Sequence, residues 1–201
     1  MHHLRNVLLI LVLLTALTGA GFVFFSTNFN EQKKLDNTLG STQIPQGIAE
    51  AKEEVRIITS SDGLKKLTLS AKSEGESSNY SVFNGSETVP FYSEILPQSI
   101  SLGLPDNSFS PGEQYLFLEK NGEGIKNTLV FMTDKSLFQN GSQFLDVYSL
   151  YNNKNLPNKF AGATGWADRT LLIIETTKED GTKGAKYWFD VPSQSFIQLA
   201  R

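Results

Sequence analysis

The feature that most constrains this chain is an uncharged apolar stretch near its start, which reads VLLILVLLTALTGAGFVFF from Val7 to Phe25. A helix of this length spans roughly 28 Å, because each residue adds about 1.5 Å, and the hydrocarbon core of a bilayer is about 30 Å thick. The sequence therefore predicts a membrane-spanning helix over residues 7–25, with membrane lipid as its partner.

The flanking charges indicate how this helix is oriented. Arg5 and the terminal amine lie directly before the apolar stretch, whereas Lys33 and Lys34 follow it at a greater distance. Basic residues close to a membrane segment favour the cytoplasmic side. We therefore expect a cytoplasmic stub over residues 1–6 and a single-pass protein whose C-terminal part lies outside the cytoplasm.

A cleavable signal peptide is the alternative interpretation of the same stretch. Thr18-Gly19-Ala20 is an acceptable small-residue cleavage site, but the apolar region of a signal peptide is normally only about 7–15 residues long. Here the apolar run continues from Gly21 to Phe25, so cleavage would leave an apolar end on the mature chain. The uncleaved signal anchor is favoured, and cleavage remains an open question.

The rest of the chain divides into a polar segment and one domain. Residues 26–54 contain Gly40, Pro45 and Gly47 among polar residues, a composition typical of a flexible stalk. Residues 55–201 are enough for one ordinary domain with its own core. The chain contains no cysteine, so this domain has no disulfide bonds and depends on its core for stability.

Short runs with a period of two dominate the domain, which indicates β-strands separated by turns. We predict an all-β fold of antiparallel meander sheets, either propeller-like blades or a β-sandwich. Residues 171–176 form a continuous apolar run that predicts a strand covered on both faces. The expected strands are 55–59, 66–71, 80–83, 115–119, 128–132, 144–148, 171–176, 187–191 and 196–199.

Three stretches repeat the plan of a turn followed by a strand. They are SSDGLKKLTL from Ser60, SPGEQYLFL from Ser110 and GWADRTLLII from Gly165. These stretches resemble the turn-and-strand signature of TolB-type and WD40-like β-propeller blades, and their spacings of about 50 and 56 residues approximate one blade each. The resemblance implies a surface for interactions and no catalytic residues. At most three blades fit in the domain, whereas closed propellers use about four or more.

Composition excludes several classes of function. Both histidines, His2 and His3, precede the apolar stretch, which excludes Ser-His-Asp triads, Cys-His pairs and histidine- or thiolate-rich zinc sites from the domain. The chain carries a formal charge of −3, and an acidic surface does not favour nucleic acid. We predict no cofactor, no metal, no catalytic residue and no nucleic-acid partner.

Two tryptophans are the candidate binding residues. Trp166 and Trp188 belong to an aromatic group with Tyr187, Phe189 and Phe196. Tyr187 and Phe189 share one strand face and Trp188 lies on the other. These side chains either fill the core or, where Trp166 or Trp188 is exposed, provide a platform for a glycan or protein partner.

Together these observations predict a membrane-anchored extracytoplasmic β-domain that acts as a non-catalytic binding or scaffolding module of the cell envelope. Self-association remains open. The competing hypothesis is a membrane-tethered hydrolase, not a binding protein. It would use a Ser–Lys pair or a pair of carboxylates, and the carboxylates in or near the expected strands are Asp146, Asp168, Glu175 and Asp190.

Overall fold

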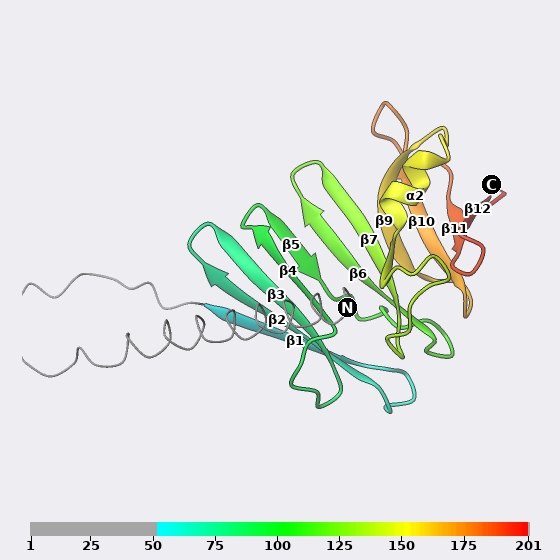
Figure 1. Cartoon of the computed structure of the whole chain (residues 1–201). Coiled ribbons are helices and arrows are strands. Elements are labelled where there is room, and N and C mark those ends of the chain that lie inside the picture. Colours follow the sequence, from blue (N-terminus) through cyan, green and yellow to red (C-terminus); the bar gives the residue numbers. More distant parts are fainter. Residues whose placement is uncertain (1–51, 201) are drawn as a thin grey trace, which may run out of the picture. The chain divides into compact units, whose positions relative to one another are not determined.

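The computed structural model of the chain describes residues 52–200, which lie within a compact unit that begins at Ala49 (Figure 1). The predicted cytoplasmic stub, the predicted helix over residues 7–25 and most of the predicted stalk fall outside the described residues. Within residues 52–200, no helix has the length and apolar character needed to cross a bilayer.

The described residues form an all-β fold with one short helix, and every strand pairing is antiparallel, as predicted. The first strand begins at Glu53, inside the segment predicted as a stalk. The elements are β1 (Glu53–Thr59), β2 (Lys66–Glu74), β3 (Ser77–Asn84), β4 (Tyr92–Pro97), β5 (Ile100–Gly103), β6 (Tyr115–Gly122), β7 (Ile125–Met132), β8 (Phe144–Asp146), α2 (Val147–Asn153), β9 (Lys159–Trp166), β10 (Leu171–Thr177), β11 (Tyr187–Asp190) and β12 (Ser195–Gln198).

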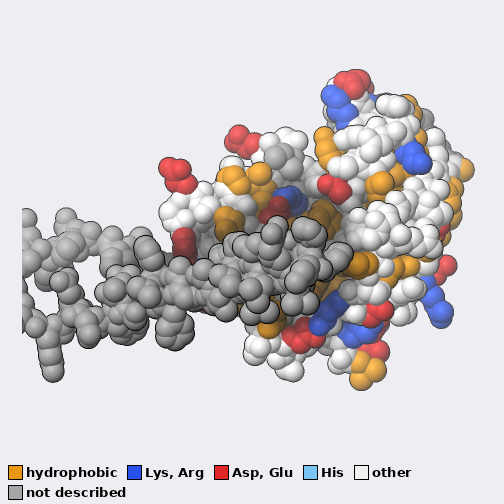
Figure 2. All heavy atoms as spheres, in the orientation of Figure 1, with side chains coloured by type: hydrophobic (Ala, Val, Ile, Leu, Met, Phe, Trp, Pro, Cys, Tyr) orange, Lys and Arg blue, Asp and Glu red, His pale blue; other side chains and the backbone are white. Residues whose placement is uncertain are grey.

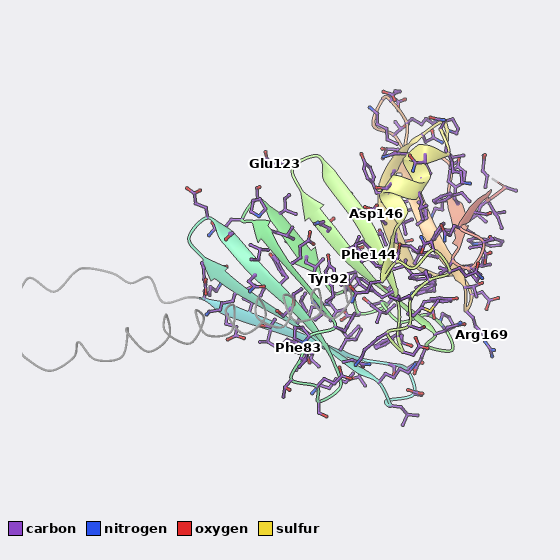
Figure 3. All side chains as sticks on the ribbon, viewed as in Figure 1. Phe83, Tyr92, Glu123, Phe144, Asp146 and Arg169 are labelled. Carbon is purple, nitrogen blue, oxygen red and sulfur yellow. The ribbon has the colours of Figure 1, made fainter. Side chains whose placement is uncertain are left out.

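These strands form three four-stranded sheets, each a simple meander in chain order. We name them the N-terminal sheet (β1–β4), the middle sheet (β5–β8) and the C-terminal sheet (β9–β12). Two-residue turns close two of the described hairpins, Gly75-Glu76 between β2 and β3 and Glu123-Gly124 between β6 and β7. The tip of the second carries the Glu123 label in Figure 3. Gly124 has a φ of 69°, a left-handed conformation that glycine adopts without steric cost.

The middle sheet lies between the other two and is buried on both faces. Leu116 and Leu118 of β6 belong to a hydrophobic cluster shared with the N-terminal sheet. Tyr115 and Phe117 point the other way, into a cluster shared with the C-terminal sheet. Alternate residues of one strand thus serve two separate cores, because successive side chains of a strand point to opposite faces.

Leucine makes up most of the first of these cores, and aromatic side chains join the two sheets across it. Tyr92 of β4 packs edge to face against Phe131 of β7, with 5.1 Å between ring centroids, and against Phe144 of β8, at 5.7 Å. Figure 3 shows Tyr92 and Phe144 close together between the two sheets. The hydroxyl of Tyr92 donates to Glu94, which also pairs with Lys120 of the middle sheet at 2.5 Å.

The prediction that residues 171–176 form a strand covered on both faces is wrong. In β10, Leu172 and Ile174 are buried in the core, but Leu171 and Ile173 on the other face remain partly exposed. The apolar run was long enough for two-sided burial, but no described element packs against this second face. Among the described strands, β6 and β7 of the middle sheet have runs of buried residues on both faces.

Other differences concern short elements. The strand expected over 144–148 ends at Asp146, whose carboxylate accepts a hydrogen bond from Ser149 N at 2.8 Å and so caps the start of α2. The sequence interpretation omitted β4, β5, β9 and α2, all short or interrupted by residues that are weak strand formers. Their absence from the prediction left the three sheets incomplete.

The repeated turns have equivalent hydrogen bonds. Ser60 N donates to Lys65 O at 2.8 Å, and Lys65 N donates to Ser60 Oγ at 2.9 Å. At the second turn Ser110 N donates to Tyr115 O at 2.9 Å, and Tyr115 N donates to Ser110 Oγ at 3.1 Å. In both turns, the serine and the residue five positions later are therefore joined by the same two hydrogen bonds.

The third turn is shorter by one residue, and the three turns lie next to one another. Ala167 N donates to Leu171 O at 2.8 Å, so the closure spans four residues. The ammonium of Lys65, in the first turn, donates to Glu113 O in the second at 2.6 Å. The side chain of Arg169, in the third turn, lies against Gly112 of the second. Each sheet therefore presents its turn at the same end of the stack.

Candidate functional site

The outer face of the C-terminal sheet carries an apolar row that includes Trp188. Trp188 of β11 lies directly across from Ile173 of β10 and Ile197 of β12. Ile197 is 48% exposed, and Trp188 and Ile173 are partly exposed. Tyr187 and Phe189 point into the core on the opposite face, which agrees with the expected alternation. Trp188 is thus placed where a partner could contact it.

Trp166 occupies a different environment. Its ring stacks on Tyr115 with 6.3 Å between centroids and meets Phe117 edge to face at 6.1 Å. Its indole N–H donates to Ser108 O at 2.9 Å. Trp166 therefore packs between the middle and C-terminal sheets, and the fold places the two tryptophans on opposite faces of the C-terminal sheet.

The outer face of the N-terminal sheet is the second uncovered surface of the described domain. Val55 is 57% exposed, Ile57 51% and Ile95 69%. Val55 stands at the end of a row of small side chains that crosses the sheet, formed by Ser70, Ser81 and Ser93. Sequence reasoning missed this surface because β4 was not predicted. The alternation of Val55, Ile57 and Thr59 was the available signal.

A polar cleft of about 440 Å³ separates the middle and C-terminal sheets beyond their shared core. It forms where the apolar residues of β6 and β7 give way to polar ones, and its lining includes Glu119, Asn121, Lys126, Thr128, Thr164 and Glu175. The Thr128 hydroxyl is buried and has no hydrogen-bond partner among the described residues. Glu175 is paired with Lys186 at 2.5 Å. This cleft contains no nucleophile adjacent to a base.

The four strand carboxylates are held in separate structural roles. Asp146 caps α2 and Glu175 pairs with Lys186, as described above. Asp168 accepts from Arg169 N at 2.7 Å, and Asp190 accepts from the hydroxyls of Thr170 at 3.1 Å and Ser193 at 2.5 Å. Each of these acids has a local structural partner, so the arrangement does not resemble a general acid–base pair.

One lysine ammonium does meet a hydroxyl. Lys65 Nζ lies 3.0 Å from Thr133 Oγ1, and that hydroxyl donates its proton to Glu113 O at 2.6 Å. In a Ser–Lys enzyme the lysine is a neutral acceptor for the hydroxyl proton, whereas here the ammonium is the donor. The neighbouring Asp62 carboxylate accepts hydrogen bonds from the Ser60 hydroxyl at 2.7 Å and from the Leu64 amide at 2.8 Å. These two bonds, the first more than the second, lower the pKa of Asp62.

Metal ligands are equally scattered. Within residues 52–200, no group of three or more histidine, cysteine, aspartate or glutamate side chains is placed to hold a metal ion. On the face seen in Figure 2, acidic and basic side chains are interspersed with apolar ones. The features of this domain that can bind a partner are therefore its two uncovered sheet faces and the polar cleft.

Comparison of the chain with protein-family models, with curated proteins and with solved structures gives no match. The class that the fold defines is thus an all-β domain of three stacked antiparallel meanders.

Proposed function

We propose that this chain is a single-pass membrane protein whose β-domain lies outside the cytoplasm and works as a non-catalytic binding or scaffolding module of the cell envelope. The observation that carries this proposal is the pair of uncovered sheet faces. One end of the three-sheet stack exposes the apolar row of Ile173, Trp188 and Ile197, and the other end exposes Val55, Ile57 and Ile95. Such surfaces on a folded domain mark sites of interaction. Trp188 is the candidate anchor residue, since tryptophan is enriched among residues that dominate binding.

We also propose that the three meanders are propeller-like blades and not the layers of a β-sandwich. A sandwich has two sheets and one core between them, whereas the middle sheet here contributes to two cores. Each sheet has four strands in chain order and a turn between its first and second strands, or just before its second. The equivalent hydrogen bonds at Ser60 and Ser110 further support a repeated unit.

The membrane anchor and the side on which the domain lies can be tested in intact cells. The chain contains no cysteine, so a single introduced thiol can be labelled without background. We expect a membrane-impermeant maleimide to label L137C, whose native leucine is 58% exposed, before lysis. H3C, in the predicted cytoplasmic stub, should be labelled only after lysis. The opposite labelling order would overturn the proposed topology.

The binding role can be tested by placing a photo-crosslinking amino acid on the uncovered faces of the full chain in its native cells. Ile57 and Ile197 are the test positions, and Leu137 is a control of similar exposure on a loop of the middle sheet. We expect defined adducts from positions 57 and 197 and none from position 137. Equal labelling at all three positions, or none at the two faces, would contradict a binding role for these surfaces.

A further inference from the structure

We propose that the partner of the two uncovered faces is a second copy of this chain. Two copies would associate head to tail, each placing the outer face of its C-terminal sheet on the outer face of the other copy's N-terminal sheet. This inference rests on the proposed function, because it names the occupant of the same surfaces. With three sheets in each copy, the assembly is a closed ring of six.

The first argument is the equivalence of the sheets within one chain. The matched turns align Lys65 with Tyr115, so Leu67 corresponds to Phe117 two residues later. Leu67 packs toward the middle sheet and Phe117 packs toward the C-terminal sheet. Each of the first two sheets therefore presents the same face to the sheet that follows it.

The C-terminal sheet presents that face to no described element. Its turn closes at Leu171, so the residue that corresponds to Leu67 and Phe117 is Ile173. Ile173 lies in the partly exposed row with Trp188 and Ile197. The face that packs against a following sheet at two places in this chain is thus present a third time with no follower among the described residues.

The N-terminal sheet shows the converse. Leu118 of the middle sheet packs back onto the preceding sheet, and its equivalent in β2 is Thr68. Thr68 lies directly across from Ile57 and Phe83, on the outer face, where no described sheet precedes it. The two uncovered faces are therefore the two halves of a junction that the chain already forms twice internally.

The side chains on the two faces complement each other in size. The outer face of the C-terminal sheet has the bulky row of Ile173, Trp188 and Ile197. The outer face of the N-terminal sheet has a central row of small residues, Ser70, Ser81 and Ser93, beside Val55. The bulky row of one face can lie over the small central row of the other, and this permits close approach of the two sheets at that row, as in interiors packed at native density.

Closure distinguishes this arrangement from an open chain of subunits. A head-to-tail interface gives a ring if the rotation closes and a filament if it does not. Closed propellers have about four to eight blades, and six lies within that range. A twofold axis along the ring axis places the start of β1 of both copies on the same side, which is the geometry that two anchors in one membrane require.

The test uses the full chain in detergent micelles, a flexible bismaleimide and the double variant I95C/I197C, whose native isoleucines lie on the equivalent fourth strands β4 and β12. We expect a covalent dimer on denaturing gels and little product of higher order, because both junctions of a closed pair are bridged. Each single variant, I95C or I197C, should stay monomeric. The control L137C/I197C keeps one thiol on a face and moves the other to a loop, and it should also stay monomeric.

Other outcomes overturn the proposal. Dimers formed by a single variant would mean that like faces meet, and a ladder of higher products would mean an open filament. A second measurement avoids dependence on crosslinking: light scattering of the native chain should give the protein mass of two copies, and I197E or I57E should reduce it to one. L137E should leave the dimer intact.

The two proposals fail in distinguishable ways. If positions 57 and 197 crosslink to a different protein in cells while the purified chain is monomeric, the binding role stands and the inference of self-association is wrong. If the faces capture neither another copy nor another protein, both proposals are wrong.

Discussion

The middle sheet and the N-terminal sheet follow the same plan but are built from different residues. In the middle sheet, the start of β6 reads YLFL and all four side chains are buried. In the N-terminal sheet, β2 reads KLTLSAKSE and only Leu67 and Leu69 are buried. The turn, the strand order and the hydrogen bonding are shared, so the difference in sequence reflects how many neighbours each sheet has. The turn residues thus determine the strand order within a sheet, and the number of apolar residues in its second strand reflects whether one or both of its faces are covered.

Substitutions at equivalent positions in the two sheets are expected to differ most in their effect on stability. Leu118 is fully buried, and L118A should lower the free energy of unfolding by about 2–5 kcal/mol, because it removes buried methyl groups and leaves a cavity. The equivalent variant T68A, on the uncovered face, should change it by less than about 0.5 kcal/mol. Urea unfolding followed by tryptophan fluorescence would measure both, and equal losses would show that Thr68 is not on an open face.

The two matched turns give a second, smaller contrast. S110A removes the acceptor of the Tyr115 amide, and Tyr115 is buried, so we expect a loss of about 1–3 kcal/mol in the free energy of unfolding. S60A removes the acceptor of the Lys65 amide, which lies nearer to solvent and can bond water instead. The S60A loss should be the smaller one in the same urea experiment. The reverse order would mean that the Lys65 amide is less accessible to water than the Tyr115 amide.

A pH titration tests the core between the middle and C-terminal sheets. Burial, followed by the nearness of Tyr187, raises the pKa of Tyr151 from its usual 10.0 to about 12. The folded state therefore holds this proton more tightly than the unfolded state, and stability should be fully present below pH 10 and fall as pH rises toward 12. Y151F should show a shallower decline in the urea midpoint. Burial and Glu94 also raise the pKa of Tyr92, so some decline will remain.

The smallest effects should come from the uncovered faces. Ile95 is 69% exposed, and I95S should change the free energy of unfolding by less than about 0.5 kcal/mol in the monomer. Circular dichroism on heating would detect a larger loss. A large loss in dilute protein would show that another part of this chain covers the outer face of the N-terminal sheet.

Much of this architecture is predictable from local sequence, and the remainder depends on contacts between sheets. The alternation in residues 66–71 and the turn signal in the stretch from Ser60 located a strand and the turn before it correctly, because turn chemistry and period are local properties. The burial of β10 could not be read in this way, since a run of Leu and Ile is compatible with one covered face or two. Short strands such as β4 and β5 are fixed by pairing partners far along the chain.

The candidate site was predictable only in part, for the same reason. The alternation around Trp188 correctly placed it opposite Tyr187 and Phe189. Whether that opposite face is covered depends on the stacking of sheets, which no local pattern records. Trp166 illustrates the limit: its indole bonds to Ser108 and stacks on Tyr115, residues more than forty positions away. The serine row across β2, β3 and β4 likewise emerges only from their register.

Every sheet is a meander in chain order, and this has a mechanical consequence. If the chain is tethered through its N-terminal segment, a pull on that tether acts first at β1, an edge strand whose backbone pairs with β2 alone among the described strands. Hydrogen bonds loaded from one end of a hairpin open in sequence, so β1 should peel from its neighbour before the middle sheet bears load. The domain would therefore unfold in small steps from its tethered end. The middle sheet, which is buried on both faces, would resist extension longer than the N-terminal sheet.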